Sequence, residues 1–179
     1  MRLTKLLFYY IIKAMEQLCV KIGEFEKPVK TCVFTGHRHL RDEFSLSDLK
    51  NAVEQCILKG TEIFYNGMAM GFDLLAAEVV LQMKKKYPHV RLIACIPFYG
   101  QEKNFPETDK KRYCEILKQA DEQILLSEHY FHGCLPRRDL YMVKQADSMI
   151  AYCKKTTGGA AYTVKCFQKV CPNGEILYL

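Results

Sequence analysis

The chain has 179 residues, 49% of them hydrophobic, and carries 26 Lys and Arg against 20 Asp and Glu, a net charge of +6. This length suits one domain with a sizeable core, and so small a basic excess, half of it from residues 1–30, does not indicate the concentrated positive patch of a nucleic-acid-binding protein. The nine cysteines include no Cys-x-x-Cys pair, which argues against a zinc site or a disulfide framework and fits buried cysteines in a reducing cytoplasm.

The first 28 residues are set apart from the rest. Their apolar run, residues 6–12, is shorter than the roughly 20 residues that a membrane span needs. Lys13 and Glu16 follow at once and no small-x-small cleavage site appears, which argues against a signal peptide. We therefore expect residues 1–28 to be an amphipathic helical extension and residues 29–179 to be the folded domain. An over-extended start codon is the second interpretation.

Strand-like and helix-like segments alternate through the remaining chain. The apolar runs that predict strands are residues 31–34, 62–65, 90–96, 123–127, 148–153 and 175–179. The segments between them carry apolar residues at a 3.6-residue spacing, as in Leu49, Val53 and Ile57 after a capping Ser45 or Ser47. This alternation predicts an α/β fold with a parallel sheet and helices on both faces. In such sheets a ligand binds outside the carboxyl ends of the strands.

The stretch from residue 66 to residue 78 reads as a strand end, a glycine turn and a helix start. Gly67 permits a tight turn, and Gly71 allows a backbone or a ligand to come close. Asp73 then opens an alanine-rich helix, whose first backbone N–H groups favour a phosphate. The alternative is an ordinary turn in which Asp73 is a cap or a first-turn acid.

The loop that follows the first strand carries similar chemistry. Thr35, Gly36, His37 and Arg38 follow the first strand, where an arginine could bind a phosphate through two hydrogen bonds. No carboxylate or cysteine lies beside His37, so we expect no metal there.

The late loops complete the pattern. Gly158 and Gly159 lead from the fifth strand into a helix that contains Thr163. Arg137 and Arg138 lie near another helix start, where they oppose the helix dipole, so that either a bound anion or a nearby carboxylate would offset them. Since all these loops follow strands, one shared crevice is the simplest hypothesis.

Several motifs in this order resemble the YpsA-like branch of the SLOG superfamily, which also contains the Smf/DprA DNA-processing proteins and the LOG phosphoribohydrolases. The motifs are residues 34–38, 67–78, 96–102, 137–143 and 157–164, and the similarity runs from about Thr31 to the C-terminus. The resemblance implies a single Rossmann-like domain whose glycine loops bind a nucleotide or a nucleotide-derived small molecule. The ligand-binding residues that it implies, together with those above, are Thr35, Gly36, His37, Arg38, Gly67, Met68, Gly71, Asp73, Arg138, Gly158, Gly159 and Thr163.

One departure from the related enzymes bears on activity. LOG hydrolases carry a catalytic Glu after their late glycine loop, whereas residues 158–165 here contain none. Our first hypothesis is therefore a cytoplasmic protein that binds or senses a nucleotide-derived ligand, without a further cofactor. The second is a nucleotide N-glycosidic hydrolase that uses Asp73 or Glu78, although an ordinary surface role is favoured for Glu78. The third hypothesis, and the least favoured, is single-stranded DNA binding. Separately, the edge strands and the apolar N-terminal segment suggest a homo-oligomer.

Overall fold

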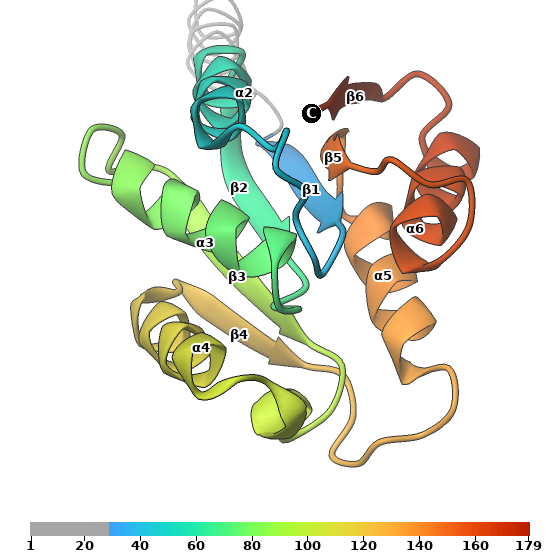
Figure 1. Cartoon of the computed structure of the whole chain (residues 1–179). Coiled ribbons are helices and arrows are strands. Elements are labelled where there is room, and N and C mark those ends of the chain that lie inside the picture. Colours follow the sequence, from blue (N-terminus) through green and yellow to red (C-terminus); the bar gives the residue numbers. More distant parts are fainter. Residues whose placement is uncertain (1–28) are drawn as a thin grey trace, which may run out of the picture.

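The computed structural model describes residues 29–179, so the expected extension over residues 1–28 lies outside the described residues. Six strands form one sheet in the order β4-β3-β2-β1-β5-β6, and every neighbouring pair is parallel (Figure 1). The strands are β1 (Lys30–Gly36), β2 (Thr61–Asn66), β3 (Arg91–Ile96), β4 (Glu122–Leu125), β5 (Ser148–Tyr152) and β6 (Glu175–Tyr178). The expected α/β fold with a parallel sheet is confirmed.

Helices cover both faces of this sheet. They are α2 (Leu46–Leu58), α3 (Phe72–Met83), α4 (Glu107–Gln119), α5 (Cys134–Lys144) and α6 (Gly159–Val170), with a short 3₁₀ helix, η1 (Gln101–Asn104), before α4. Figure 1 shows α2, α3 and α4 together on one side of the strands and α5 and α6 on the other. Two hydrophobic clusters follow this division, one under α2 to α4 and one under α5 and α6.

The central strands are apolar on both faces, which explains their continuous hydrophobic runs. In β1, Cys32 and Phe34 belong to the cluster under α2 to α4, whereas Val33 between them belongs to the cluster under α5 and α6. In β5, Ile150 belongs to the first cluster and Met149 to the second. The two-residue period of a strand thus distributes one apolar run between two cores.

The chain reverses its direction of winding beside β1. After β1 it adds β2, β3 and β4 in turn on one side, and then returns through α5 to place β5 on the other side of β1. The carboxyl ends of β1 and β5 are paired, Gly36 with Tyr152. In open α/β sheets this switch point is where a crevice forms and ligands bind.

Segment boundaries differ from the expected ones in places. The fourth strand ends at Leu125 rather than at Ser127, because β4 pairs only with β3, which ends at Ile96. The segment between β3 and α4, for which no helix was expected, contains η1. Within residues 29–179, no helix is long and apolar enough to cross a bilayer.

Candidate functional site

A small crevice lies at the switch point, over the carboxyl ends of β1 and β5. Its volume is about 100 Å³. The side chains and loops that line it come from β1, from the β2–α3 turn, from α5 and from α6, and include Thr35, Gly36, Arg38, Ala69, Asp73, Leu135, Arg138, Asp139, Gly159, Ala160 and Thr163. We call it the switch-point crevice. A second hollow of about 180 Å³, here called the outer hollow, adjoins it and shares Arg38, Ala69, Leu135 and Arg138 with it.

A buried group of charged side chains forms the wall of this crevice on the α5 side. Arg138 is only 5% exposed, and its Nε donates a 2.7 Å hydrogen bond to Oδ1 of Asp139. Its Nη1 donates to the backbone carbonyl of Gly67. The sequence left open whether an anion or a carboxylate offsets this arginine, and the structure supplies the carboxylate of Asp139.

Asp73 is the second buried carboxyl group of the crevice. It is 6% exposed, lies in the first turn of α3, and its Oδ2 accepts a 3.3 Å hydrogen bond from the backbone N–H of Ala69. Burial raises the pKa of Asp73 to about 7, although attraction by Arg138 opposes that rise. Near neutral pH this carboxyl group can therefore hold or release a proton. The cap position itself is Gly71, so Asp73 is a first-turn acid rather than the cap.

The β2–α3 turn is held by buried polar groups. Met68 has a positive φ of 55°, its N–H donates a 2.8 Å hydrogen bond to Oδ1 of Asn66, and its carbonyl accepts from Gln101. Its side chain is fully buried in the core under α2 to α4. The side chain of Met68 therefore does not line the crevice, in contrast to its expected place among the ligand-binding residues.

Gly71 brings two loops together. Its φ of +82° suits glycine, and a Cβ there would collide with the backbone of Arg38. The N–H of Phe72 also donates a 3.1 Å hydrogen bond to the carbonyl of His37. The close approach expected at Gly71 is therefore made by the backbone of the first-strand loop.

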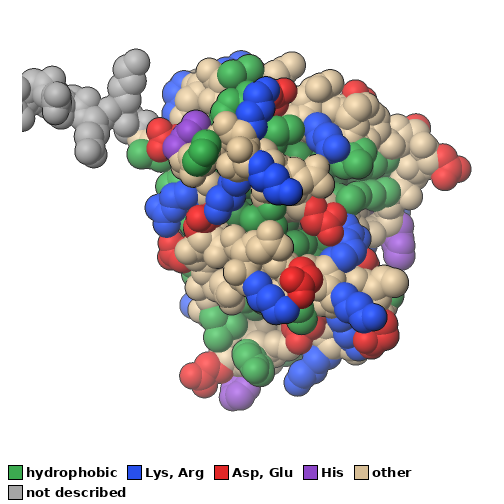
Figure 2. Space-filling model, turned by 90° about the vertical axis from the view of Figure 1, so that its left-hand side faces the viewer, with side chains coloured by type: hydrophobic (Ala, Val, Ile, Leu, Met, Phe, Trp, Pro, Cys, Tyr) green, Lys and Arg blue, Asp and Glu red, His purple; other side chains and the backbone are tan. Residues whose placement is uncertain are grey.

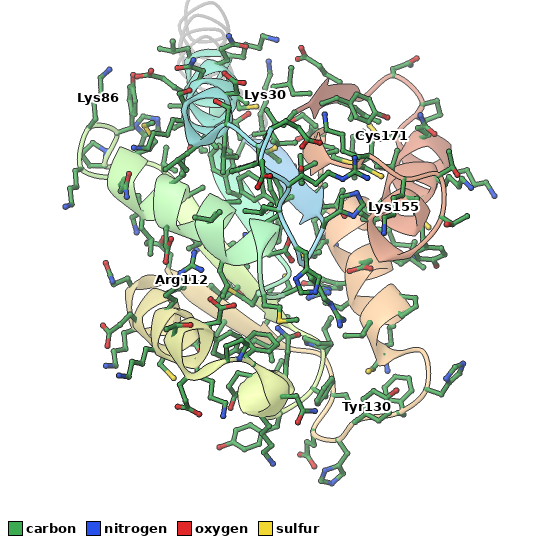
Figure 3. All side chains as sticks on the ribbon, viewed as in Figure 1. Lys30, Lys86, Arg112, Tyr130, Lys155 and Cys171 are labelled. Atoms are coloured by element: carbon green, nitrogen blue, oxygen red, sulfur yellow. The ribbon has the colours of Figure 1, made fainter. Side chains whose placement is uncertain are left out.

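His37 also fastens one loop to another. Its Nε2 accepts a 2.9 Å hydrogen bond from the N–H of Lys154, and its ring packs edge to face on Tyr152 at 5.6 Å. Partial burial, followed by the charges of Lys155 and Arg41, lowers the pKa of His37. The imidazole thus joins the loop after β1 to the loop after β5, which carries Lys155, labelled in Figure 3. His37 does not line the crevice.

Thr35 and Arg38 offer their polar groups to the crevice. Thr35 is 7% exposed, and its hydroxyl has no hydrogen-bond partner among residues 29–179. Arg38 is exposed, lines both the crevice and the outer hollow, and its guanidinium makes no ion pair within the same residues. These are two of the groups that sequence reasoning selected.

The start of α6 closes the crevice on the β5 side. Gly158 caps this helix with a φ of +95°, without any side-chain hydrogen bond, and a Cβ on Gly158 or Gly159 would have nothing within 4 Å. The hydroxyl of Thr163 is 2.9 Å from the carbonyl of Gly159 and 3.1 Å from Oδ2 of Asp139, so it is already engaged. The first N–H groups of α6, by contrast, have no acceptor in the described part of the chain.

Glu78 lies elsewhere. Arg112 of α4 donates to its two carboxylate oxygens at 2.7 and 2.9 Å, and both residues line a groove between α3 and α4, where Figure 3 labels Arg112. Five residues along a helix correspond to about 140° of rotation, so Glu78 and Asp73 face different directions. Of the two candidate acids, only Asp73 is at the crevice.

Three polar residues of the site were not among the expected ones. Asn66 is fully buried, and its Nδ2 donates a 2.8 Å hydrogen bond to the carbonyl of Asp73. Gln101 supports the β2–α3 turn, and Asp139 holds Arg138. The position of Asn66 at the end of an apolar strand could have identified it from the sequence, because a polar side chain beside a core needs a hydrogen-bond partner.

Comparison with known proteins places the chain in a family. The model of the YpsA family, described as "YspA SLOG family", matches residues 27–175. The chain is 30% identical over 154 residues to UPF0398 protein BH1768 of Halalkalibacterium halodurans. The aligned region covers 79% of this chain and 82% of that protein. It is 25% identical over 134 residues to UPF0398 protein YpsA of Bacillus subtilis, covering 68% and 74%.

Two solved structures share the fold at low sequence identity. DNA processing protein A (DprA) from Streptococcus pneumoniae has a TM-score of 0.61 and 17% identity, over 84% of this chain and 50% of that chain. DprA from Helicobacter pylori has a TM-score of 0.59 and 16% identity, over 83% and 64%. The chain thus spans between half and two thirds of these DprA structures. These two structures share the fold, whereas the family match over residues 27–175 and the relative at 30% identity establish that the chain belongs to the YpsA family of SLOG proteins.

Proposed function

We propose that this protein binds a nucleotide or a nucleotide-derived small molecule in the switch-point crevice, with a phosphate group at the start of α6. One observation carries the proposal: three kinds of hydrogen-bond donor without internal partners meet there. They are the hydroxyl of Thr35, the guanidinium of Arg38 and the first backbone N–H groups of α6. Each of these groups readily donates a hydrogen bond to a phosphate oxygen.

Electrostatics favour an anion at this end of the crevice. The dipole of a helix is equivalent to about half a positive charge at its N-terminus. Lys154 and Lys155 precede α6, and Arg38 lines the same crevice as the start of α6. The open space beside Gly158 and Gly159 leaves room for a phosphate group to approach the backbone.

The opposite wall of the crevice suits a sugar. The carboxyl group of Asp73 can accept a hydrogen bond from a ribose hydroxyl when it is ionised, and can donate one when it is protonated. Because its pKa is raised to about 7, both forms are populated near neutral pH. Binding in the cytoplasm, as a sensor or scaffold, is the role that we assign.

N-glycosidic hydrolysis is the second candidate function. The feature in its favour is Asp73, since a buried carboxyl group with a pKa near 7 is suited to proton transfer at neutral pH. Against it stands the late loop, in which residues 158–165 contain no carboxylate. Asp139, the other acid of the crevice, is held by Arg138 and Thr163.

Single-stranded DNA is the third candidate partner. The similarity to DprA structures supports this partner more than the small net positive charge of the chain did. DprA from Helicobacter pylori has a single-stranded DNA binding mode, which is a property of that protein. In the present chain, Figure 2 shows basic and acidic side chains interspersed on the face over α3 and α4. A nucleotide therefore remains our preferred ligand.

A thermal-shift titration with AMP, ADP-ribose and NAD tests the proposal, followed by chromatography for released base. A ligand at 100 times its dissociation constant should raise the melting temperature by about 5 to 10 °C for a chain of this size. In Arg38→Ala we expect binding to weaken by about 10- to 100-fold, because a charge-assisted hydrogen bond is lost. A shift with no free base supports binding alone, whereas released base supports hydrolysis.

Arg41→Ala is the matched control. Arg41 lies on the same loop, but it approaches Glu43 and does not line the crevice. Equal losses in the two variants would indicate a general charge effect, and the proposed contact at Arg38 would then be wrong. The absence of any shift with all three nucleotides would contradict nucleotide binding in the crevice.

A further inference from the structure

A larger hollow lies beyond the outer hollow, on the β4 side of the carboxyl edge. This third hollow has a volume of about 940 Å³ and lies against η1 and the loops that follow β3 and β4. It shares Phe98, Gln101, Asn104 and Tyr130 with the outer hollow, which adjoins the switch-point crevice. The three hollows therefore lie next to one another along the carboxyl edge of the sheet, from the start of α6 to the loops that follow β3 and β4. We call the third hollow the aromatic hollow.

Aromatic rings dominate the aromatic hollow. Phe98 and Tyr130 pack edge to face with their ring centroids 5.2 Å apart, so each limits the movement of the other. Tyr130 is nevertheless 65% exposed, and Figure 3 shows it on the loop between β4 and α5. An exposed ring that is held by another ring offers a flat surface on which a planar group can stack.

The charges of the aromatic hollow differ from those at the start of α6. Lys103 and Glu128 are the fully charged side chains that line it, and they have opposite signs. A phosphodiester chain would require several positive charges along its path. This hollow therefore suits an uncharged ring better than further phosphate groups.

The polar edge of the ring also has a candidate partner. Gln101 lines both the outer and the aromatic hollow, and its Nε2 is directed to the carbonyls of Gly67 and Met68. Its Oε1 is buried and has no hydrogen-bond donor within the described residues. This oxygen therefore still needs a donor, which an N–H group of a bound base would provide, and a satisfied acceptor is more stable than an unsatisfied one.

The separation of the two ends indicates the length of the ligand. The start of α6 follows β5, whereas Phe98 follows β3, and three strand spacings of the sheet separate β5 from β3. At about 4.8 Å per spacing this amounts to roughly 14 Å. Over this span a nucleoside monophosphate is too short to reach from a phosphate at α6 to a base beside Phe98, but a nucleoside diphosphate derivative is long enough.

We propose that Phe98 and Tyr130 form a base-binding subsite, so that the protein takes a nucleoside diphosphate derivative whose base stacks on Tyr130 while its phosphates lie between Arg38 and the start of α6. This inference rests on the proposed function, because the phosphate end is the same in both. It adds the orientation of the ligand and its chemical class.

Isothermal titration calorimetry with ADP-ribose, AMP and inorganic pyrophosphate tests the subsite. We expect ADP-ribose to bind the wild type more tightly than AMP. Tyr130→Ala should weaken ADP-ribose binding by at least about fivefold, because stacking on the base is lost, and should leave pyrophosphate binding unchanged. Tyr130→Phe, which keeps the ring, should bind ADP-ribose as the wild type does. Tyr178→Ala is the matched control, since Tyr178 is also exposed but lies on the edge strand β6.

The outcomes separate the subsite from the proposed function. If Arg38→Ala weakens ADP-ribose binding and Tyr130→Ala does not, the phosphate end stands and the base subsite is wrong. If the wild type binds none of pyrophosphate, AMP and ADP-ribose, both proposals fall. If Tyr130→Ala instead reduces a salt-dependent affinity for an oligo-dT strand without affecting ADP-ribose, the aromatic hollow serves single-stranded DNA, and the subsite as proposed is overturned.

Discussion

The guanidinium of Arg138 donates a hydrogen bond to the backbone carbonyl of Gly67, which joins α5 to the turn between β2 and α3. The two residues are 71 positions apart in the sequence. A Cβ on Gly67 would lie 2.5 Å from Nη1 of Arg138 and 2.9 Å from Oδ2 of Asp73, so a larger residue would force these two side chains to shift. The wall of the crevice therefore depends on one buried cation and the absence of one side chain.

Arg138→Met should destabilise the fold strongly. The substitution leaves the carboxyl groups of Asp73 and Asp139 buried without their cation, and breaking a buried ion pair costs about 3 to 5 kcal/mol. Urea unfolding at neutral pH measures the free energy of unfolding. Arg137→Met is the control, because Arg137 only approaches the ring of Phe131 at 5.9 Å, and we expect a change within about 1 kcal/mol. Similar losses in both variants would contradict the assigned role of Arg138.

Asp73→Asn should change the pH dependence of stability. In the unfolded chain the pKa of Asp73 is about 3.9, whereas burial raises it to about 7 in the folded protein. The folded state thus holds the proton more tightly, so the contribution of Asp73 to stability is fully present below about pH 4. That contribution is lost as pH rises through about 7.

The amide of Asn remains neutral at every pH and still offers an oxygen to the N–H of Ala69. Relative to wild type, Asp73→Asn should therefore be more stable at pH 8 than at pH 5, by up to a few kcal/mol. Urea unfolding of both proteins from pH 5 to pH 8 gives this difference. Glu78→Gln, outside the crevice, serves as the control. A difference between Asp73→Asn and wild type that does not vary with pH would show that Asp73 is ionised throughout.

Gly71→Ala and Gly158→Ala form a matched pair. Both glycines have a positive φ that other residues rarely adopt, so each substitution carries a backbone cost of about 1 to 3 kcal/mol. A Cβ on Gly71 would also meet the backbone of Arg38, whereas a Cβ on Gly158 would meet nothing within 4 Å. Thermal unfolding should show a clearly larger loss for Gly71→Ala. Equal losses would mean that the first-strand loop moves aside at no cost.

Acidification should weaken the contact made by His37. Its Nε2 accepts a hydrogen bond from Lys154, and protonation removes the lone pair that accepts it. Because the pKa of His37 is lowered in the folded protein, this contribution is present above the ordinary pKa of about 6.5 and is lost as pH falls through the lowered value. His37→Phe should be less stable than wild type at pH 8, and the difference should narrow as pH falls toward 5. A constant difference would contradict the proposed hydrogen bond.

Local patterns in the sequence were sufficient for the elements and for their class. Ser45 caps α2 through a 3.2 Å hydrogen bond from the N–H of Asp48, and the apolar run that begins at Ser148 forms β5. These features depend on residues within a few positions of one another, so periodicity and capping chemistry predict them. The alternation of strands and helices likewise predicted a parallel sheet, whose carboxyl edge brings Thr35, Arg38 and Gly159 together.

Only the tertiary structure decided how those residues are used. Asp73 and Arg138 are far apart in the chain, and the raised pKa of Asp73 comes from burial between elements that meet after folding. Gly71 accommodates the backbone of Arg38, and His37 binds Lys154 of another loop. The sequence by itself determined which side chains reach the edge of the sheet, because strand ends are local features. Packing between distant segments decides which of those side chains make internal contacts and which remain available to a ligand.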